Sequence, residues 1–443
     1  MPAQTQTTGS IGVGAVIQVR TERLAYLGGA VAHHEGLAIF VPFAAPDELL
    51  EVRITEHKKR FARAVIQKIL VPSAVRRQPP CRYFGDCGGC QLQHITYPAQ
   101  LSAKAAFVRD SLERIGRIDW PHGIEVKSAD EFGYRLKAQV KVARHHSEFS
   151  RARSQTRTAA GAVVSGALTD PAAEIDRDDN RSLDVGFNRE ASHSVCDIVS
   201  CPILVPELDS ALTLLRSAVA SGTAIFNPDH QDEFELAAGN SEVACAPGLP
   251  GLSTGPVERI AGGLRYLFGP DTFFQSNSFL LDDLVNATVE NECGGLAIDL
   301  YAGVGLFSAR LASEFERVLA VESEPRAVAL GRKNMANNAV RNVEYYTRPV
   351  ESWIKEHLIR CGPDRKGSTD LVVLDPPRAG AASIIDDLLA MGPRRITYVS
   401  CDPVTLSRDL ARLVPAYRIK QIVAFDLFPQ TYHVETVTKL ELG

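Results

Sequence analysis

A cysteine at the end of a short β-type run is the side chain of this sequence best suited to act as a nucleophile. Cys401 follows the run 398–400 and precedes Asp402 and Pro403, a pattern typical of a strand that ends in a loop. The downstream segment that contains Glu435 is expected to bring a carboxylate to the same edge. A nucleophile beside a base is the arrangement of covalent catalysis, whereas a lone cysteine is usually a small buried residue.

A glycine-rich turn about 100 residues upstream of Cys401 predicts a nucleotide-like ligand. Asp299 ends an apolar run, and Gly303 and Gly305 allow the backbone to turn tightly into a helix. The turn lacks the third glycine of the dinucleotide fingerprint, so it is weak for NAD. Glu322 ends the next predicted strand, 17 residues after Gly305. A carboxylate there can accept hydrogen bonds from both ribose hydroxyls, and we expect this role rather than an exposed charge.

The motif Asp375-Pro376-Pro377-Arg378 follows the apolar run 371–374. Its two prolines remove two backbone donors and stiffen the loop. Such a stretch can simply end a strand. Because this strand is the fourth of an α/β series, we expect the motif to line the active site at the same sheet edge.

The elements that must position these residues form an alternating series from about residue 266 onward. The alternation predicts parallel strands with crossover helices, a doubly wound α/β sheet. The expected strands are 297–300, 317–321, 342–346, 371–374, 396–400 and 419–425. The expected helices are 305–315, 325–339 and 381–391.

Residues 10–72 contain short β-type runs separated by turn signals and are expected to form a small OB-like barrel, a common nucleic-acid platform. The chain has a net charge of −5, but residues 51–120 hold 13 Lys and Arg against 6 Asp and Glu. This basic segment is either a footprint for phosphates or a solvated surface.

Three cysteines, Cys81, Cys87 and Cys90, supply three soft ligands within ten residues. A fourth is needed, and we expect Cys201, which precedes a proline, because Cys-Pro also occurs beside iron–sulfur ligands. Cys196 is the competing candidate. Four thiolates suit both an iron–sulfur cluster and zinc. The spacing differs from the Cys-x3-Cys-x2-Cys run typical of radical enzymes.

The domain organisation follows from these patterns. Residues 10–72 form the barrel, 73–265 a central domain with the cysteines and a helix over 98–115, and 266–443 the α/β domain. Residues 147–182 are expected to be a mobile insertion. With 45% hydrophobic and 23% charged residues, no long apolar run and no leader, the chain is expected to be cytoplasmic, without membrane contact, and by default a monomer.

Together these motifs resemble the RNA 5-methyluridine methyltransferases, which use S-adenosylmethionine. The front of the chain is similar to the TRAM domain of this family, and the resemblance covers nearly the whole chain outside 147–182. The matching segments are, in chain order, Phe274-Gln275-Ser276-Asn277, Asp299-Leu300-Tyr301 with Gly303 and Gly305, Val321-Glu322, Asp375-Pro376-Pro377-Arg378, Tyr398-Val399-Ser400-Cys401 with Pro403, Thr405-Leu406, Arg408-Asp409 and His433-Val434-Glu435.

The resemblance implies a Rossmann-like class I methyltransferase sheet and a role for each matching residue. S-adenosylmethionine would be held by Gln275, Tyr301, Glu322 and Asp375. Cys401 would add to uracil C6, and Glu435 would be the base that removes the C5 proton. Asp402 stands where many relatives have asparagine. Relatives with the cysteine cluster carry a [4Fe–4S] centre, which favours that centre over zinc at Cys81, Cys87, Cys90 and Cys201.

The resemblance also implies an RNA partner. The cysteine cluster favours large-subunit (23S) ribosomal RNA, with the T loop of transfer RNA as the alternative. Arg135 and Lys137 match a basic strand that faces RNA in relatives, although such a strand can also be an ordinary exposed one. An adenine amino-methyltransferase has an aromatic residue where this chain has Arg378 and needs no Cys401, and a non-catalytic RNA-binding protein has no reason to keep the cofactor edge.

Overall fold

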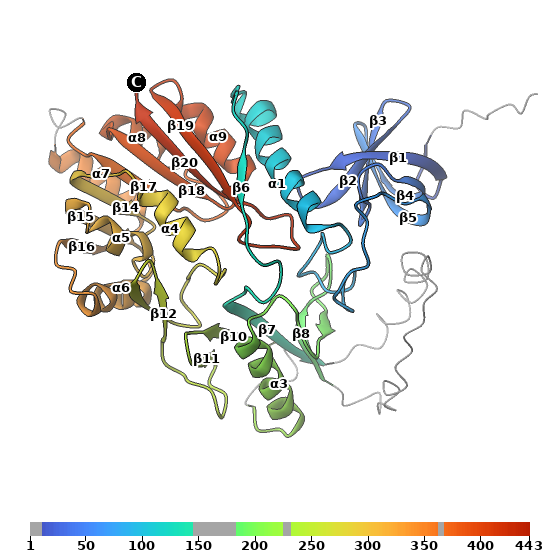
Figure 1. The fold of residues 1–443 in the computed structure, drawn as a ribbon, viewed down its shortest axis with the longest axis horizontal. Coiled ribbons are helices and arrows are strands. Elements are labelled where there is room, and N and C mark those ends of the chain that lie inside the picture. Colours follow the sequence, from blue (N-terminus) through green and yellow to red (C-terminus); the bar gives the residue numbers. More distant parts are fainter. Residues whose placement is uncertain (1–10, 145–182, 225–231, 362–366) are drawn as a thin grey trace, which may run out of the picture.

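The computed structural model describes residues 11–144, 183–224, 232–361 and 367–443 (Figure 1). The insertion expected at 147–182 lies outside these residues. Within them, no helix combines the length and the apolar character needed to cross a membrane.

The N-terminal segment forms a closed barrel, drawn in blue in Figure 1. Alternate side chains of its fourth strand, Leu50, Val52 and Ile54, are fully buried in the barrel interior, as the period-two pattern requires. Its strands, in spatial order, are β1 (Val16–Leu24), β2 (Gly29–His34), β3 (Leu37–Pro42), β5 (Phe61–Val71) and β4 (Leu49–His57).

The central segment forms a second sheet, covered by helix α3 (Pro206–Ala220), whose leucines pack against the apolar face of the sheet. The strands, in spatial order, are β11 (Val243–Ala246), β10 (Asp232–Ala238), β7 (Lys137–Arg144), β8 (Leu183–Asn188) and β9 (Val195–Asp197). A hairpin of β12 (Val257–Ala261) and β13 (Leu264–Phe268) leads to the next domain.

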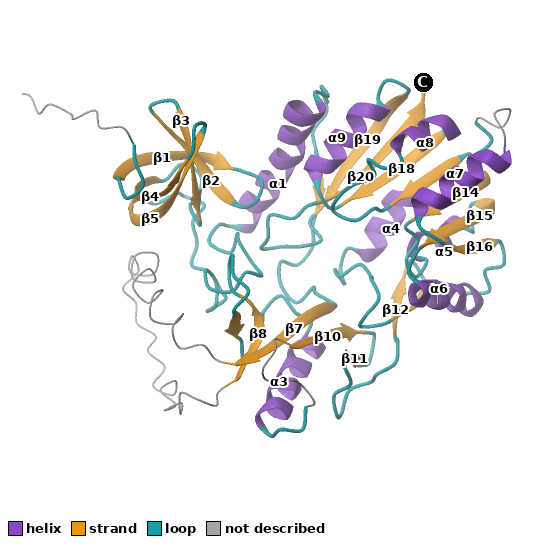
Figure 2. Cartoon of the chain, turned by 180° about the vertical axis from the view of Figure 1, so that it is seen from behind, coloured by secondary structure: helices purple, strands orange, loops and turns teal. Residues whose placement is uncertain are grey.

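The C-terminal domain is built on a mixed sheet of eight strands with helices on both faces (Figure 2). In β14, Ala297 packs on one face, and Ile298 and Leu300 pack on the other. The strands, in spatial order, are β16 (Val343–Thr347), β15 (Phe315–Glu322), β14 (Gly294–Leu300), β17 (Leu371–Leu374), β18 (Arg395–Ser400), β20 (Glu435–Leu442), β19 (Tyr417–Phe425) and β6 (Glu125–Lys127).

The expectation of an all-parallel sheet is wrong at one edge. The six expected strands form, but β20 lies between β18 and β19 and runs antiparallel to both. Its sequence gave no apolar alternation, because Thr436 and Thr438 are fully buried in it alongside the apolar residues.

The helices of this domain are α4 (Leu281–Val289), α5 (Leu306–Leu311), α6 (Pro325–Asn337), α7 (Val350–Cys361), α8 (Ile385–Met391) and α9 (Pro403–Leu413). Helix α1 (Tyr97–Ser111), followed by a π-helical turn at Leu112–Gly116, packs on α9 and β19, as both views show. With β6 it carries residues of the 73–265 range into the α/β domain.

We predict that Gly305→Ala destabilises the α/β domain by about 2–4 kcal/mol, because it adds both a steric clash and backbone strain. Gly305 has φ +90°, and a Cβ there would lie 2.2 Å from Tyr345 Oη and 2.8 Å from Met335 Cε. Gly303→Ala is the matched control: φ is also positive, at +53°, but nothing lies within 4 Å of the added Cβ. Urea denaturation measures both, and equal losses would contradict the steric argument.

Candidate active site and cysteine pocket

Strand pairing brings the predicted nucleophile and the predicted base together. In the antiparallel register of β18 and β20, Ser400 lies opposite Thr436. Cys401 follows Ser400 and Glu435 precedes Thr436, so both lie at the same end of the pair. Glu435 is only 2% exposed, and its Oε1 has no hydrogen-bond partner in the described part of the chain.

The surroundings of Cys401 disfavour a thiolate. Burial, followed by the charges of Glu435 and Asp375, raises the pKa of Cys401 to about 12, and Asp402 adds to the rise. Arg378 opposes it. These side chains alone hold Cys401 as a neutral thiol at neutral pH, and a cation placed beside them would favour the thiolate.

The pKa values of two carboxyl groups near Cys401 are raised as well. Burial and the charge of Asp375 raise the pKa of Glu435 well above its usual value. Burial raises the pKa of Asp375 to about 7, against a hydrogen bond of 3.0 Å from Gln275 Nε2 to its Oδ2. A positively charged ligand between these groups would lower the pKa of each, because it stabilises every anion it touches.

The glycine turn and Glu322 form one unit at the neighbouring strand ends. Glu322 Oε2 accepts a hydrogen bond of 2.9 Å from Gly303 N, and its Oε1 accepts from Ser323 N at 2.6 Å and Glu324 N at 2.8 Å. Tyr301, in the same turn, has a left-handed φ of 64°. The carboxylate is therefore fixed at the end of β15, and the acceptor site left on its Oε2 suits a hydroxyl of a ribose.

Asp402 accepts hydrogen bonds from two directions. Its Oδ1 caps α9 by accepting from Val404 N at 2.8 Å and Thr405 N at 2.9 Å. Its Oδ2 accepts from Tyr26 Oη of the barrel at 3.1 Å. The carboxylate thus links the loop that carries Cys401 to the barrel. The sequence gives no signal for Tyr26, which lies 376 residues away along the chain.

The two basic residues expected to face RNA have other contacts. Lys137 donates to the backbone oxygens of Gly269, at 3.2 Å, and Thr272, and it is half-buried. Burial lowers its pKa to about 8. Lys137 therefore holds the turn that leads to Gln275 instead of presenting a free charge. Arg135 donates to Lys137 O and lines the pocket of cysteines.

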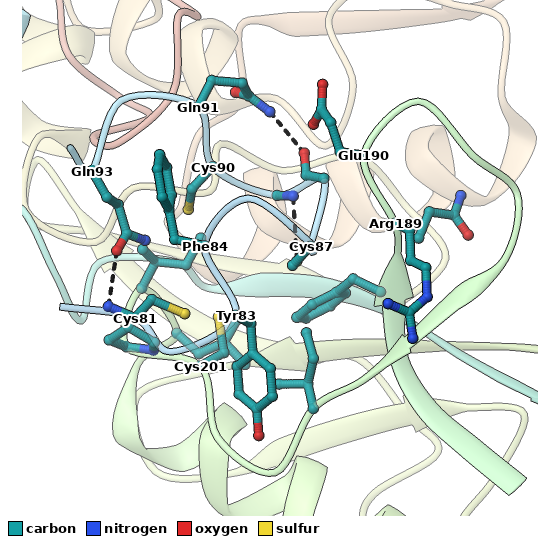
Figure 3. A pocket seen from close by; sticks show the side chains of 18 of the residues that line it. Cys81, Tyr83, Phe84, Cys87, Cys90, Gln91, Gln93, Arg189, Glu190 and Cys201 are labelled. Atoms are coloured by element: carbon teal, nitrogen blue, oxygen red, sulfur yellow. Dashed lines mark hydrogen bonds between the residues drawn. The ribbon is translucent and has the colours of Figure 1, made fainter. Parts of the chain in front are cut away.

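The structure gathers four of the predicted metal ligands around one cavity of about 460 Å³. Figure 3 shows Cys81, Cys87 and Cys90 on one loop and Cys201 facing them. The rival candidate, Cys196, does not line this cavity, and its Sγ donates to Asp86 Oδ2 at 3.4 Å.

These thiols lie close enough to affect one another. Burial raises the pKa of Cys87 to about 11 and those of Cys90 and Cys201 to about 12, and neighbouring thiols add to each rise. Among the residues that the structure describes, no three His, Cys, Asp or Glu side chains converge closely enough to hold a single metal ion. The four thiols nevertheless line one and the same pocket.

Comparison with known proteins agrees with this geometry. A family model described as tRNA (Uracil-5-)-methyltransferase matches residues 259–442, and one for the TRAM domain matches residues 12–66. The chain is 30% identical over 460 residues to the 23S rRNA (uracil(1939)-C(5))-methyltransferase RlmD of Klebsiella pneumoniae (strain 342), with 96% of each chain covered. The RlmD of Shewanella amazonensis is also 30% identical, over 467 residues, with the same coverage.

A solved structure with the same fold contains S-adenosyl-L-homocysteine, the molecule that remains after S-adenosylmethionine has given up its methyl group. The crystal structure of Pyrococcus abyssi tRNA (uracil-54, C5)-methyltransferase with S-adenosyl-L-homocysteine has a TM-score of 0.68 and 26% identity, and covers 95% of this chain and 99% of its own. The expected class I methyltransferase sheet and TRAM barrel are thereby confirmed. The chain belongs to the RNA (uracil-C5)-methyltransferases, which methylate C5 of uracil in RNA with S-adenosylmethionine as the methyl donor.

Proposed function

We propose that this enzyme methylates a uridine of large-subunit ribosomal RNA through a covalent bond between Cys401 and uracil C6. The observation that carries the mechanism is the register of β18 and β20, which brings Cys401 and Glu435 to the same end of the strand pair. The buried Oε1 of Glu435 has no hydrogen-bond partner among the residues that the structure describes. The curated relatives covered over 96% of their length act on 23S rRNA. Transfer RNA, the substrate of the Pyrococcus enzyme, is the second candidate.

The reaction needs both residues. The Cys401 thiolate adds to C6, and the electrons of the C5–C6 double bond pass to C5 and O4. C5 then attacks the methyl group of the sulfonium, whose S–CH₃ bond breaks to leave S-adenosylhomocysteine. Glu435 takes the proton from C5, the double bond re-forms, and the C6–S bond breaks with its electrons returning to Cys401. The target base must first leave its stack to reach the pocket.

The buried carboxyl groups suit a cationic methyl donor. Without a cation, a pKa of about 12 keeps Cys401 a neutral thiol at neutral pH, and burial with the charge of Asp375 disfavours the charged form of Glu435. A sulfonium beside Asp375 would lower these pKa values and favour the charged forms that the reaction uses. Glu322 would bind the ribose, and Gln275, Tyr301 and Asp375 would complete the donor site.

The cysteine pocket is proposed to hold a [4Fe–4S] cluster on Cys81, Cys87, Cys90 and Cys201. Four thiols around one cavity of about 460 Å³ suit a cluster. Zinc, which four thiolates also suit, is the alternative occupant. The cluster would link two distant segments and neutralise their thiolates.

We predict that Cys401→Ala lowers turnover by about four orders of magnitude or more, because the nucleophile is lost. With RNA that contains 5-fluorouridine and with S-adenosylmethionine, the wild type is expected to form an adduct that survives denaturing gels, and Cys401→Ala to form none. Adduct formation by Cys401→Ala would contradict the mechanism. Glu435→Gln separates the steps, because it should trap a methylated adduct even on unmodified RNA.

We predict that Asp402→Asn lowers the pKa of Cys401, since one of the negative charges that raises it is removed. Thiolate at pH 8 to 9 should then increase, and alkylation of Cys401 by iodoacetamide should be roughly two- to five-fold faster. Peptide mass spectrometry across a pH series measures this rate, and the curve should shift to lower pH. Asp386→Asn, on the exposed surface of α8, is the control. An unchanged or slower alkylation of Cys401 would contradict the inference that the charge of Asp402 raises the pKa of Cys401.

We predict that Cys201→Ser reduces the iron content and the visible absorption of protein purified without oxygen, because one cluster ligand is lost. Cys196→Ser is the matched control and should keep both. Loss of iron in Cys196→Ser instead would exchange the two roles. Zinc rather than iron in the wild type, measured by elemental analysis, would overturn the choice of metal.

The ribosomal target can be tested by mapping 5-methyluridine in total RNA from cells with and without the gene. Loss of one 5-methyluridine from large-subunit RNA would support the proposal. Loss from the T loop of transfer RNA alone would favour the second candidate.

A further inference from the structure

Gln430 stands out in the segment that leads from β19 to Glu435. It is fully buried, and its φ of 71° is left-handed, a conformation unfavourable for a residue with a Cβ. Such strain persists only where surrounding contacts impose it. The hydrogen bonds of Gln430 account for its left-handed conformation.

The backbone of Gln430 is bound to the loop of cysteines. Its carbonyl oxygen accepts hydrogen bonds from Gln91 N and Leu92 N, both at 2.9 Å. Gln91 directly follows Cys90, which lines the cysteine pocket. The left-handed conformation and the contact with the cysteine loop therefore occur at the same residue.

The side chain of Gln430 is bound to three further residues. Its Oε1 accepts from Gln100 Nε2 at 3.0 Å and from Arg77 Nη2 at 3.2 Å, and its Nε2 donates to Glu131 Oε2 at 2.8 Å. Gln100 Oε1 in turn accepts from Gln430 N at 3.1 Å. The backbone and side-chain amides of Gln430 thus have hydrogen-bond partners throughout, as a buried polar group requires.

The rest of the segment is held from the same side. The fully buried Lys104 of α1 forms an ion pair with Asp426 and donates to Phe428 O at 3.0 Å. Tyr134 Oη donates to Pro429 O at 3.0 Å. These partners come from residues 77–134, before the α/β domain begins. The segment before Glu435 is therefore held jointly by α1, by Tyr134 and, through Gln430, by the cysteine loop.

We propose that Gln430 is a positioning residue for the proton-abstraction step and that it couples the cysteine loop to Glu435. Glu435 lies five residues beyond Gln430 and starts β20. A shift of the cysteine loop would move the Gln430 carbonyl and, with it, the start of β20. Cys401 lies between β18 and α9, and the hydrogen bonds of Gln430 go to neither of them, so its addition to C6 would be affected much less. This inference rests on the proposed role of Glu435 as the base.

The test is Gln430→Met, which keeps the length of the side chain and removes its hydrogen-bonding groups. Turnover on RNA is expected to fall about 10- to 100-fold, as for a small displacement of a catalytic group. The adduct on unmodified RNA should accumulate, because release needs the base. The rate of adduct formation on 5-fluorouridine RNA should stay within about two-fold of wild type, because trapping does not need proton removal. Gln421→Met, on an exposed position of β19, is the matched control.

A second variant, Gln100→Met, removes two of the hydrogen bonds to Gln430, together with those to Leu92 O and Ile95 O, without changing the segment itself. It should show the same accumulation of adduct to a smaller extent, and it keeps the test decisive where Gln430→Met fails to fold. Wild-type turnover in a folded Gln430→Met would overturn the proposal. So would an equal fall of turnover and of adduct formation on 5-fluorouridine RNA, which indicates a general structural defect.

Glu435→Gln, assayed in parallel, tests the assignment of Glu435 as the base separately from the positioning role of Gln430. Normal turnover in Glu435→Gln would show that the assignment of the base is wrong. Accumulation of adduct in Glu435→Gln, together with wild-type behaviour of Gln430→Met and Gln100→Met, would leave the base in place and reject only the positioning role.

Discussion

The antiparallel pairing of β20 with β18 is the constraint on which the catalytic geometry depends. Without it, Cys401 and Glu435 would lie 34 residues apart on separate loops. The register that places Ser400 opposite Thr436 brings both to one end of the sheet, where the glycine turn and Glu322 also lie. Because a slip of one residue would turn every side chain of β20 to the opposite face, the register is also a requirement of the proposed mechanism.

Burial determines the pKa values of the acidic groups at this end of the sheet. Asp375 and Glu435 lie close to the Cys401 thiol, and burial raises the pKa of each. Such an arrangement is unfavourable for three anions and favourable once a cation enters. The site is thus suited to a sulfonium methyl donor, and such a donor would favour the charged forms of Cys401 and Glu435.

The sequence predicted the local elements well and the long-range contacts poorly. The strands that end at Leu300, Glu322 and Leu374 were foreseen, because apolar runs followed by glycine, acidic or proline residues are local signals. Strand β20 was missed because its buried threonines hide the alternation. The hydrogen bond of Tyr26 to Asp402 and the ion pair of Lys104 with Asp426 carry no local signal at all, since each joins residues that are distant in sequence.

The central claim is that Cys401 bonds covalently to the target base, and identification of the modified peptide tests it most directly. After reaction with 5-fluorouridine RNA and S-adenosylmethionine, digestion with nuclease and trypsin should give a peptide from Ile396 to Arg408 that carries the methylated nucleotide on Cys401, its sole cysteine. A nucleotide attached to any other residue, or a methylated product formed with no adduct at all, would contradict the account.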